Sequence, residues 1–428
     1  MPGSPAPAPP PTPVAEVVDG SGGSRVAQWL AGDDHLLGQL RSVVGPWHHV
    51  VVGLDGRAAA PEELAEAEAA VARQLAAGRA PEEHRRSDVV RTRRELVALS
   101  RRRGEGSVAV VRAEPELLPH LQIGSWYAAG WRARWARRAA LPWSRLASLM
   151  PVGLAADVAF WSGVRRSATG REWRRLTSSS YVVLCYHRLT GLGSPGQERM
   201  DVEPRALRRH LRVLRLLRWH ALSHDDLVRF HTDPDAVLPR RCYVVTADDG
   251  FAEAVTELQR HGRHHPQLFV VTAAAGGTSY WMGDEPVADW PDVAAAVAGG
   301  AQVGSHARHH VRLDEQDHAT VREELQGSRD EIAAHLGVVP GALAYPHGGH
   351  DRAVRDAARD AGYDLAYTTR QGRNGAGTDR WCLRRVEPKL WDDAASLTWK
   401  MLTAQSPPSR WERRLRATWE RRRAQSSG

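Results

Sequence analysis

The sequence predicts an α/β fold with parallel strands for the C-terminal half of the chain, and three observations support this. From Tyr181 onward, short apolar strands alternate with amphipathic helices over about 200 residues, which is typical of a barrel-like or doubly wound sheet. Acidic residues and histidines come directly after several of these strands, where the ligand-binding edge of such a sheet lies. The chain has 428 residues, more than one domain usually has, so a smaller unit is expected as well.

The N-terminal part is predicted to be a tail followed by a small module. Residues 1–23 are mostly Pro, Ala, Gly and Ser and are expected to be disordered, because they cannot bury enough apolar surface to offset the entropy of ordering. They do not resemble a secretory signal, so a cytoplasmic location is expected. Residues 24–122 are predicted to form a small α/β module, with strands at His49–Leu54 and Ser107–Arg112 and helical sequence from Pro61. A helical module is the alternative.

Residues 123–178 are predicted to form a helical connector rich in Trp and Arg. Trp131 and Trp135 stand among arginines, and the stretch Leu149–Val164 is almost entirely apolar. This stretch has about 16 residues and contains Asp157, whereas a transmembrane helix needs ~20. It is therefore either a connector packed on the catalytic domain or a segment that lies on an anionic membrane surface.

The last residues, 401–428, are predicted to form a basic helix. Trp411, Leu415 and Trp419 recur at helical i, i+4 spacing among arginines, so a peripheral membrane contact is again one of two interpretations.

Charge and cysteine usage exclude several functions. The chain carries a formal net charge of +8, but no nucleic-acid-binding signature accompanies its basic helices, so no nucleic-acid partner is expected. Cys185, Cys242 and Cys382 are odd in number and form no C-x-x-C pair, which argues against a disulfide framework or a structural zinc site. We expect reduced, mostly buried thiols.

Residues 179–400 contain the alternating pattern. Strands are predicted where apolar residues run together, at Tyr181–Tyr186, Cys242–Thr246, Gln267–Thr272, Leu343–Tyr345 and Leu365–Thr368. Helices are predicted at Pro204–Leu217, Ala252–His261, Val321–Leu336 and Arg352–Ala361. In the first of these helices, leucines at 207, 211, 214 and 217 share one face. A further apolar run, Ala294–Val303, is expected to end in another strand.

Two adjacent carboxylates follow the predicted strand Cys242–Thr246. Asp248 and Asp249 precede Gly250, and two carboxylates at a strand end are costly unless a cation uses them. A bound divalent metal would do so. The alternative is an Asx turn, which Gly250 also suits.

A histidine cluster follows the run Ala294–Val303. If this segment is locally helical, His306 and His310 share one face and can chelate one ion, while His309 points away. Two His and one Asp leave positions open on a metal, as a catalytic site requires. Zinc suits these ligands, although the metal that binds also depends on supply.

The turn after the strand Leu343–Tyr345 is the third predicted site element. Tyr345 and His347 are candidates for oxyanion or substrate contacts, because the glycines after His347 let the backbone approach a ligand and donate N–H groups. An ordinary β-to-α turn is the alternative. Substrate specificity is expected to depend on loops such as Gly276–Asp292.

In this order and spacing, these stretches resemble the polysaccharide deacetylase family, the carbohydrate esterases of family four with chitooligosaccharide-deacetylase homology. The resemblance covers about Tyr181–Pro388. Six ordered motifs carry it: Tyr186-His187-Arg188, Thr246 to Gly250, Gly304 to His310 with Leu313, Ala344 to Gly348, Ala361 to Thr369, and Leu383 to Val386.

The resemblance implies a deformed (β/α) barrel with fewer than eight repeats and a metal-dependent hydrolase acting on acetylated carbohydrate. By motif position it implies that Asp248 is the general base and that Asp249, His306 and His310 hold the metal. The early Tyr-His pair is similar to that of the permuted branch that includes exopolysaccharide N-deacetylases, which makes His187 the general acid. Alternatives are a core histidine at 187, an O-deacetylase, and a catalytically weak carbohydrate-binding module.

Three features depart from the family pattern. Ala247 stands where Phe is usual and Ala307 where Ser or Thr is usual, and both changes are expected to weaken support of the metal ligands. No arginine precedes the Tyr-Pro pair at position 345. We hypothesise that Arg384 or Arg385 supplies this missing cation.

Overall fold

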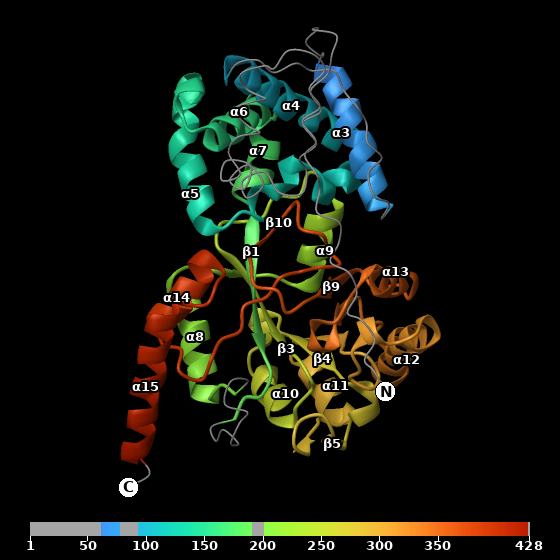
Figure 1. Ribbon diagram of the computed structural model, residues 1–428. Helices are drawn as coiled ribbons and strands as arrows, with labels where there is room; N and C mark the ends of the chain where they lie inside the picture. Colours follow the sequence, from blue (N-terminus) through green and yellow to red (C-terminus); the bar gives the residue numbers. More distant parts are fainter. Residues whose placement is uncertain (1–60, 78–92, 191–200, 427–428) are drawn as a thin grey trace, which may run out of the picture. The chain divides into compact units, whose positions relative to one another are not determined.

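The computed structural model describes residues 61–77, 93–190 and 201–426. The chain divides into two compact units, Met1–Trp173 and Arg174–Gly428, and each is described by itself (Figure 1). The predicted tail at residues 1–23 and the predicted strand His49–Leu54 lie outside the described residues.

The described part of the N-terminal unit is helical. Its elements are α3 (Pro61–Ala76), α4 (Arg93–Ala113), η2 (Pro115–His120), η3 (Gln122–Trp126), α5 (Trp131–Ala140), η4 (Leu141–Leu149) and α6 (Val152–Ser167), with α7 (Gly170–Thr177) crossing the boundary between the units. The predicted strand Ser107–Arg112 is wrong, because these residues belong to α4. Gly104, Ser107 and Val108 are buried at i, i+3, i+4 spacing, so helix packing outweighs the strand propensity of the valines.

Helices α4 and α6 meet backbone to backbone at two glycines. A Cβ atom added at Gly104 would lie 2.0 Å from the carbonyl oxygen of Phe160. A Cβ added at Gly163 would lie 2.0 Å from the carbonyl oxygen of Arg101. Only glycine permits this close approach.

Helix α6, which contains most of the apolar stretch, packs inside the N-terminal unit. Its Asp157 accepts two hydrogen bonds from Arg137 of α5, at 2.6 and 2.8 Å, and both residues are buried. The rings of Trp126 and Trp161 lie edge to face beside this pair, with centroids 4.6 Å apart. Among the described residues, no single helix is long and apolar enough to cross a bilayer; Trp131–Leu149 and Val152–Ser167 meet that criterion only together, bent by 119°.

The second unit is built on a mixed sheet with the order β10-β1-β3-β4-β7-β8-β9 and with β2 beside β3. The strands are β1 (Ser180–Tyr186), β2 (His220–Ala221), β3 (Cys242–Ala247), β4 (Gln267–Val270), β7 (Gln302–Ser305), β8 (Ala342–Ala344), β9 (Leu365–Tyr367) and β10 (Asn374–Gly375). Neighbours from β1 to β9 are parallel, and β10 pairs antiparallel with β1. A short hairpin, β5 (Thr278–Ser279) and β6 (Glu285–Pro286), stands apart from this sheet.

Helices surround the sheet, which curls into a deformed barrel (Figure 1). They are α8 (Pro204–Leu216), α9 (His224–Thr232), α10 (Ala252–Gln259), α11 (Trp290–Ala298), α12 (His318–Leu336), α13 (Arg352–Asp360), α14 (Ala394–Thr403) and α15 (Ser409–Ser426). The predicted strands and helices of this unit are therefore confirmed, with ends that differ by one to three residues. The predicted apolar face of α8 is buried at Leu207, Leu211 and Leu214. Leu217 does not belong to it, because it follows the last residue of the helix and is 37% exposed.

An extended segment, residues 383–386, joins the two edges of the parallel sheet. Leu383 forms a parallel bridge with Tyr367 at the end of β9, and Val386 forms one with Leu184 in β1. The backbone N–H of Val386 donates to Val183 at 2.8 Å, and that of Leu383 donates to Ala366 at 2.9 Å. This closure brings the last sequence motif back to the first strand.

Candidate active site

Loops at the carboxyl ends of four parallel strands carry the predicted site residues. His187 follows β1, Asp248 and Asp249 follow β3, His306 follows β7, and His347 follows β8. Because parallel strands end at the same edge of a barrel, the fold brings these residues together.

Asp249, His306 and His310 form a compact group whose candidate ligand atoms all lie within 4.8 Å of one another. Nε2 of His306 is 3.5 Å from Oδ1 of Asp249, and Nε2 of His310 is 3.1 Å from the same oxygen. Two donors that share a tetrahedral zinc at 2.0–2.1 Å lie about 3.3 Å apart. The group therefore has the spacing of a metal site.

Burial and hydrogen bonding also fit a metal. Oδ1 of Asp249 is buried without a hydrogen bond of acceptable geometry, so an oxygen lone pair is left for another partner. Nδ1 of His306 lies 2.8 Å from the carbonyl oxygen of Ala344, which can only accept, so Nδ1 carries the hydrogen and Nε2 is free to bind a metal. Burial lowers the pKa of His306 to about 4, so the ring is neutral near pH 7, as a ligand must be.

The predicted helical spacing of the two histidines is wrong. Residues 306–310 are not helical; instead Ala307 and His310 adopt left-handed φ angles of 60° and 54°. These turns bring both rings to Asp249. His309 points away as predicted, and its Nδ1 lies 2.7 Å from a carboxylate oxygen of Glu324.

The two alanines that depart from the family pattern are both buried. Ala307 has a left-handed φ, which a β-branched residue such as Thr adopts at high cost, and its N–H donates to Oγ of Ser305 at 3.1 Å. Ala247 ends β3 and packs in the core beside Tyr186.

Arg385 pairs with Asp248, as the hypothesis of a replacement cation requires. Its guanidinium donates to both oxygens of Asp248, at 2.6 and 2.7 Å, and its Nε donates to the carbonyl oxygen of Thr368 at 3.0 Å. Of the two arginines considered, the contact thus selects Arg385 over Arg384. Burial by itself would raise the pKa of Asp248, but the charge and hydrogen bonds of Arg385 outweigh it and hold that pKa well below its usual range.

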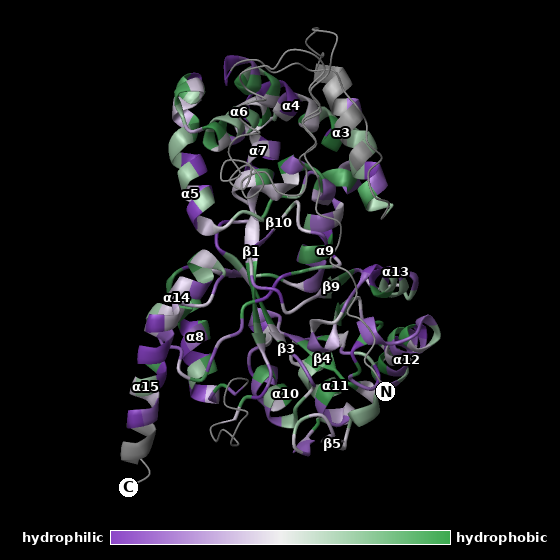
Figure 2. Ribbon diagram, in the orientation of Figure 1, coloured by the Kyte–Doolittle hydropathy of each residue, from purple (hydrophilic) through white to green (hydrophobic). Residues whose placement is uncertain are grey.

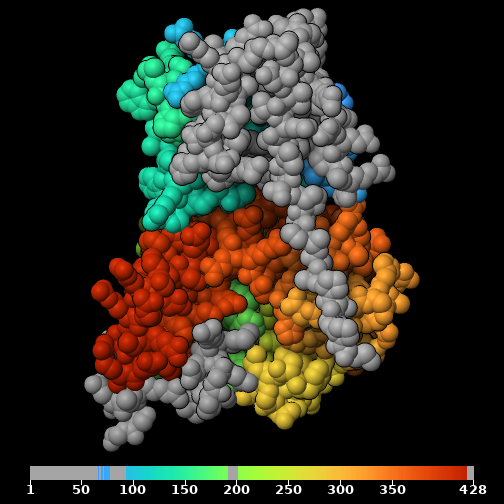
Figure 3. Space-filling model, viewed as in Figure 1, coloured from blue at the N-terminus to red at the C-terminus, as the bar shows by residue number. Residues whose placement is uncertain are grey.

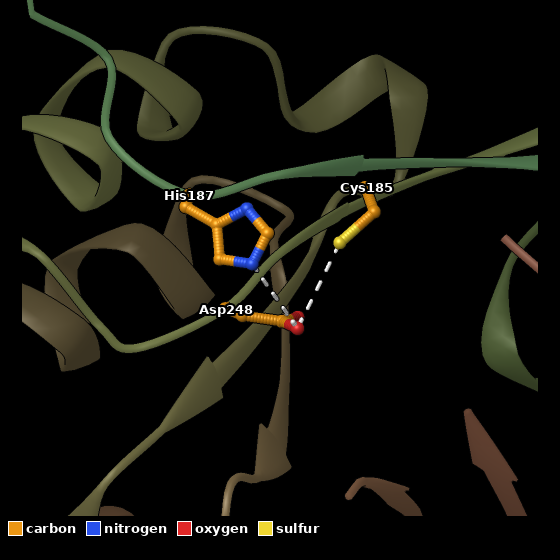
Figure 4. A group of neighbouring side chains, drawn as sticks. All are labelled: Cys185, His187 and Asp248. Atoms are coloured by element: carbon orange, nitrogen blue, oxygen red, sulfur yellow. Dashed lines mark hydrogen bonds and ion pairs between the residues drawn. The ribbon is translucent and has the colours of Figure 1, made fainter. Parts of the chain in front are cut away.

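His187 and Cys185 face Asp248 from β1 and the residue that follows it (Figure 4). Nε2 of His187 is 3.9 Å, and Sγ of Cys185 is 3.7 Å, from Oδ2 of Asp248. These three residues could also group around an ion. Burial raises the pKa of Cys185 far above its ordinary value, so the protonated thiol donates to Asp248.

Tyr345, the other predicted oxyanion or substrate contact, lies in the core. Its side chain is fully buried, its N–H donates to the carbonyl oxygen of Tyr367 at 3.1 Å, and its hydroxyl donates to that of Trp381 at 3.2 Å. The N–H groups of the turn are also bonded. Gly348 donates to the carbonyl oxygen of Tyr345 at 2.8 Å, and Gly349 donates to that of Pro346 at 3.0 Å.

His347 itself lies at the site. Its backbone φ is 56°, and its ring centroid is 4.6 Å from that of the metal-ligand candidate His310. Partial burial, with His310 nearby, lowers the pKa of His347. The lowered pKa favours the neutral ring near pH 7.

The β5–β6 hairpin adds site residues that no motif indicates. The indole of Trp281 stacks on the His310 ring, with centroids 4.5 Å apart and planes at 22°. The Tyr280 hydroxyl donates to the carbonyl oxygen of His309, and Glu285 forms a 3.0 Å ion pair with Arg188, next to the predicted acid. The hairpin is thus tied to both sides of the site, within the loop expected to govern specificity.

Cys185 was missed as a site residue, although a signal for it exists. Residues two apart in a strand point to the same face, so Cys185 shares the site-facing side of β1 with the residue at 187. The hairpin residues carry no comparable signal, since their place depends on tertiary contacts.

Comparison with known proteins identifies the family of this unit. Residues 235–366, which include the two aspartates and the histidine cluster, match the family model described as polysaccharide deacetylase. The sequence therefore contains a polysaccharide deacetylase domain. The match lies within the second unit and covers the part of the barrel from before β3 to β9. A comparison with curated proteins yields no significant match.

Several solved structures are similar to part of this chain. The Streptococcus pyogenes deacetylase PplD in complex with acetate is 19% identical, with 53% of this chain and 99% of that chain covered and a TM-score of 0.47. IcaB from Ammonifex degensii is 22% identical, with 53% and 98% covered and a TM-score of 0.45. The de-N-acetylase from Aggregatibacter actinomycetemcomitans is 16% identical, with 49% and 94% covered and a TM-score of 0.42.

Proposed function

We propose that this deacetylase domain hydrolyses N-acetyl groups on a carbohydrate in a metal-dependent reaction that releases acetate. One observation carries the proposal: two adjacent buried carboxylates have different partners. Asp249 faces two histidines, and Asp248 is held by Arg385. In this proposal, Asp249 is the metal ligand and its neighbour Asp248 is the general base.

The metal would be held by Asp249, His306 and His310, and zinc is the candidate that these ligands suit. Once bound, it would activate the attacking water and polarise the acetyl carbonyl oxygen.

Asp248 acts as the base in this proposal. Arg385 keeps its carboxylate ionised and fixes both oxygens, so Oδ2, the oxygen nearest His187, is ready to accept a proton from the attacking water. Cys185 donates a weak hydrogen bond to the same oxygen, which limits rotation of the carboxylate.

His187 acts as the acid, as in the permuted branch that the early Tyr-His pair resembles. Its Nε2 lies 3.9 Å from Oδ2 of Asp248, and it would donate a proton to the departing nitrogen as the C–N bond breaks. This placement favours N-deacetylation over O-deacetylation, because an amine leaves only after its nitrogen is protonated.

The experiment measures acetate and free amine together. Acetylated chito-oligosaccharide is incubated with the full chain, with chelator, and with chelator followed by zinc; Asp248→Asn is the matched variant. We expect equal release of acetate and amine that depends on metal and is lost in the variant. Acetate release from O-acetylated sugar alone would replace the proposal with O-deacetylation. Bound metal without turnover on either substrate would favour a binding module.

A further inference from the structure

The segment formed by α5 and η4, Trp131–Leu149, exposes an unusual number of large apolar side chains. Trp135, Trp143, Leu146 and Leu149 are 65%, 63%, 50% and 77% exposed. Large exposed apolar residues elsewhere in the described chain stand singly or in pairs. Single exposed apolar residues are ordinary, but a concentration of four within fifteen positions marks a contact surface.

The three large exposed residues of η4 are Trp143, Leu146 and Leu149, and we call them the apolar ridge. A 3₁₀-helix has three residues per turn, so Leu146 and Leu149 share one edge, while Trp143 lies at a kink that precedes them. Ala147, between the two leucines, is fully buried. The helix directs its small side chain inward and its large apolar side chains to the outside. A helix stabilised only by its own core would have the reverse pattern.

The charges along the chain on both sides of the ridge have one sign. The sequence has no Asp or Glu from Leu117 to Ala156. Arg132, Arg138 and Arg145 are exposed in the same segment, and Figure 2 shows hydrophilic and hydrophobic residues interleaved along α5. The complementary partner is therefore anionic.

Two other arginines of the segment have structural roles. Arg137 pairs with Asp157 inside the unit, and Arg134 donates to the carbonyl oxygen of Ala129 at 2.6 Å. The other three arginines, at positions 132, 138 and 145, are exposed.

We propose that the N-terminal unit binds the surface of an anionic lipid membrane through α5 and η4. The ridge Trp143–Leu146–Leu149 would enter the boundary between head groups and acyl chains, and the exposed arginines would contact lipid phosphates. Tryptophan favours this boundary because its ring is apolar and its N–H is polar. The α5 helix forms an outer edge of its unit in Figure 1, and its atoms are at the surface in Figure 3.

The basic C-terminal helix does not share this property. In α15, the ring of Trp411 packs edge to face on Trp399 of α14, with centroids 5.8 Å apart, and Leu415 and Trp419 are half-buried. Arg416 lies over the ring of Trp391 at 5.5 Å. We therefore assign the proposed membrane contact to α5 and η4.

The experiment is vesicle flotation of the full chain. Vesicles are made of phosphatidylcholine alone or of phosphatidylcholine mixed with phosphatidylglycerol. We expect binding to the mixed vesicles, weakened by salt, and little binding to the neutral ones. The double substitution Trp143→Ser and Leu149→Ser is expected to lower binding to mixed vesicles roughly tenfold. The matched control is Leu402→Ser, which removes a similarly exposed leucine from α14.

Four outcomes would overturn the proposal. They are absence of flotation with the mixed vesicles, equal flotation with both vesicle types, an equal loss in the Leu402→Ser control, and a dimer that the ridge substitutions convert to a monomer. The last result would mean that a second copy of the chain covers the ridge. Circular dichroism of each variant verifies folding, and deacetylation of a soluble substrate, which is expected to stay unchanged, separates membrane binding from the proposed activity.

Discussion

Replacing Arg385 by Met tests the assignment of the general base most directly. The substitution keeps an unbranched apolar stem but removes the guanidinium and with it both hydrogen bonds to Asp248, at 2.6 and 2.7 Å. Both residues are only 2% exposed, so the carboxylate stays buried without its cation. Loss of one partner from a buried ion pair typically costs about 3–5 kcal/mol. Two charge-assisted hydrogen bonds, at about 1.5–3 kcal/mol each, give a similar figure.

The effect on the pH profile has a definite sign. In the unaltered protein the pKa of Asp248 is lowered, so the base is ionised at any pH above the ordinary aspartate value of about 4. Without Arg385, burial remains and raises this pKa. The acidic limb of kcat/KM is therefore expected to move to higher pH, and the rate at neutral pH to fall by roughly 10²-fold or more. The stability that the pair contributes is present above about pH 4 and is lost as the pH falls.

Acetate release between pH 4 and pH 9, followed for Arg385→Met and for Arg384→Met, checks this reasoning. Arg384 is the matched control, because neighbouring residues of an extended segment point to opposite sides and it does not bond the base. Urea unfolding monitored by circular dichroism measures how far the substitution lowers the free energy of unfolding. If Arg385→Met retains the rate and the pH profile of the unaltered protein, the assignment of Asp248 as an Arg-stabilised base is refuted.

Four further predictions concern the site. Asp249→Ala is expected to abolish both zinc binding and acetate release. His309→Ala is expected to keep both, because the ring of His309 faces Glu324 and not the group of Asp249, His306 and His310. Metal analysis and acetate assays of the purified variants check this. Cys185→Ala is expected to keep the metal and to change the rate by less than about tenfold, since a thiol is a weak donor, and loss of metal would point to the second cysteine-containing group instead. Trp281→Leu removes the ring that stacks on the proposed metal ligand His310. It is expected to weaken metal affinity by about 10–100-fold in a chelator competition, and unchanged affinity would mean that the stacking does not support metal binding. His187→Gln is expected to lower kcat for amide substrate by about 10²–10⁴-fold and to affect an activated ester much less, while equal losses on both would argue against an acid role.

The strands and the strand-end placement of the site were predictable from the sequence. Apolar runs such as Tyr181–Tyr186 identify buried parallel strands, and polar residues directly after them converge because parallel strands end at one edge. This simple rule is sufficient to bring Asp248 and His187 together. It needs no information about loop conformation.

Loop geometry was not predictable in the same way. The sequence offered both Arg384 and Arg385 as the cation, and only the pairing of residues 383–386 with the strands on either side decides which one turns inward. Left-handed φ angles at Ala307 and His310 replaced the expected helix, because non-glycine residues carry no reliable signal for that conformation. The stretch Ser107–Arg112 was misassigned because alternating valines fit a strand as well as a helix when the partner is unknown.

The crossing of α4 and α6 places a limit on how the N-terminal unit can diverge. Any side chain at Gly104 or Gly163 would collide with a backbone carbonyl on the opposite helix, which cannot move aside as a flexible side chain can. The exposed positions of α5 have no such restriction, so individual residues there can be substituted as long as the surface stays apolar and basic. In distant homologues of this unit, the two glycines should therefore persist after most of the tryptophans and arginines have changed. The two glycines, 59 positions apart, are therefore a better mark of this unit than its content of tryptophan and arginine.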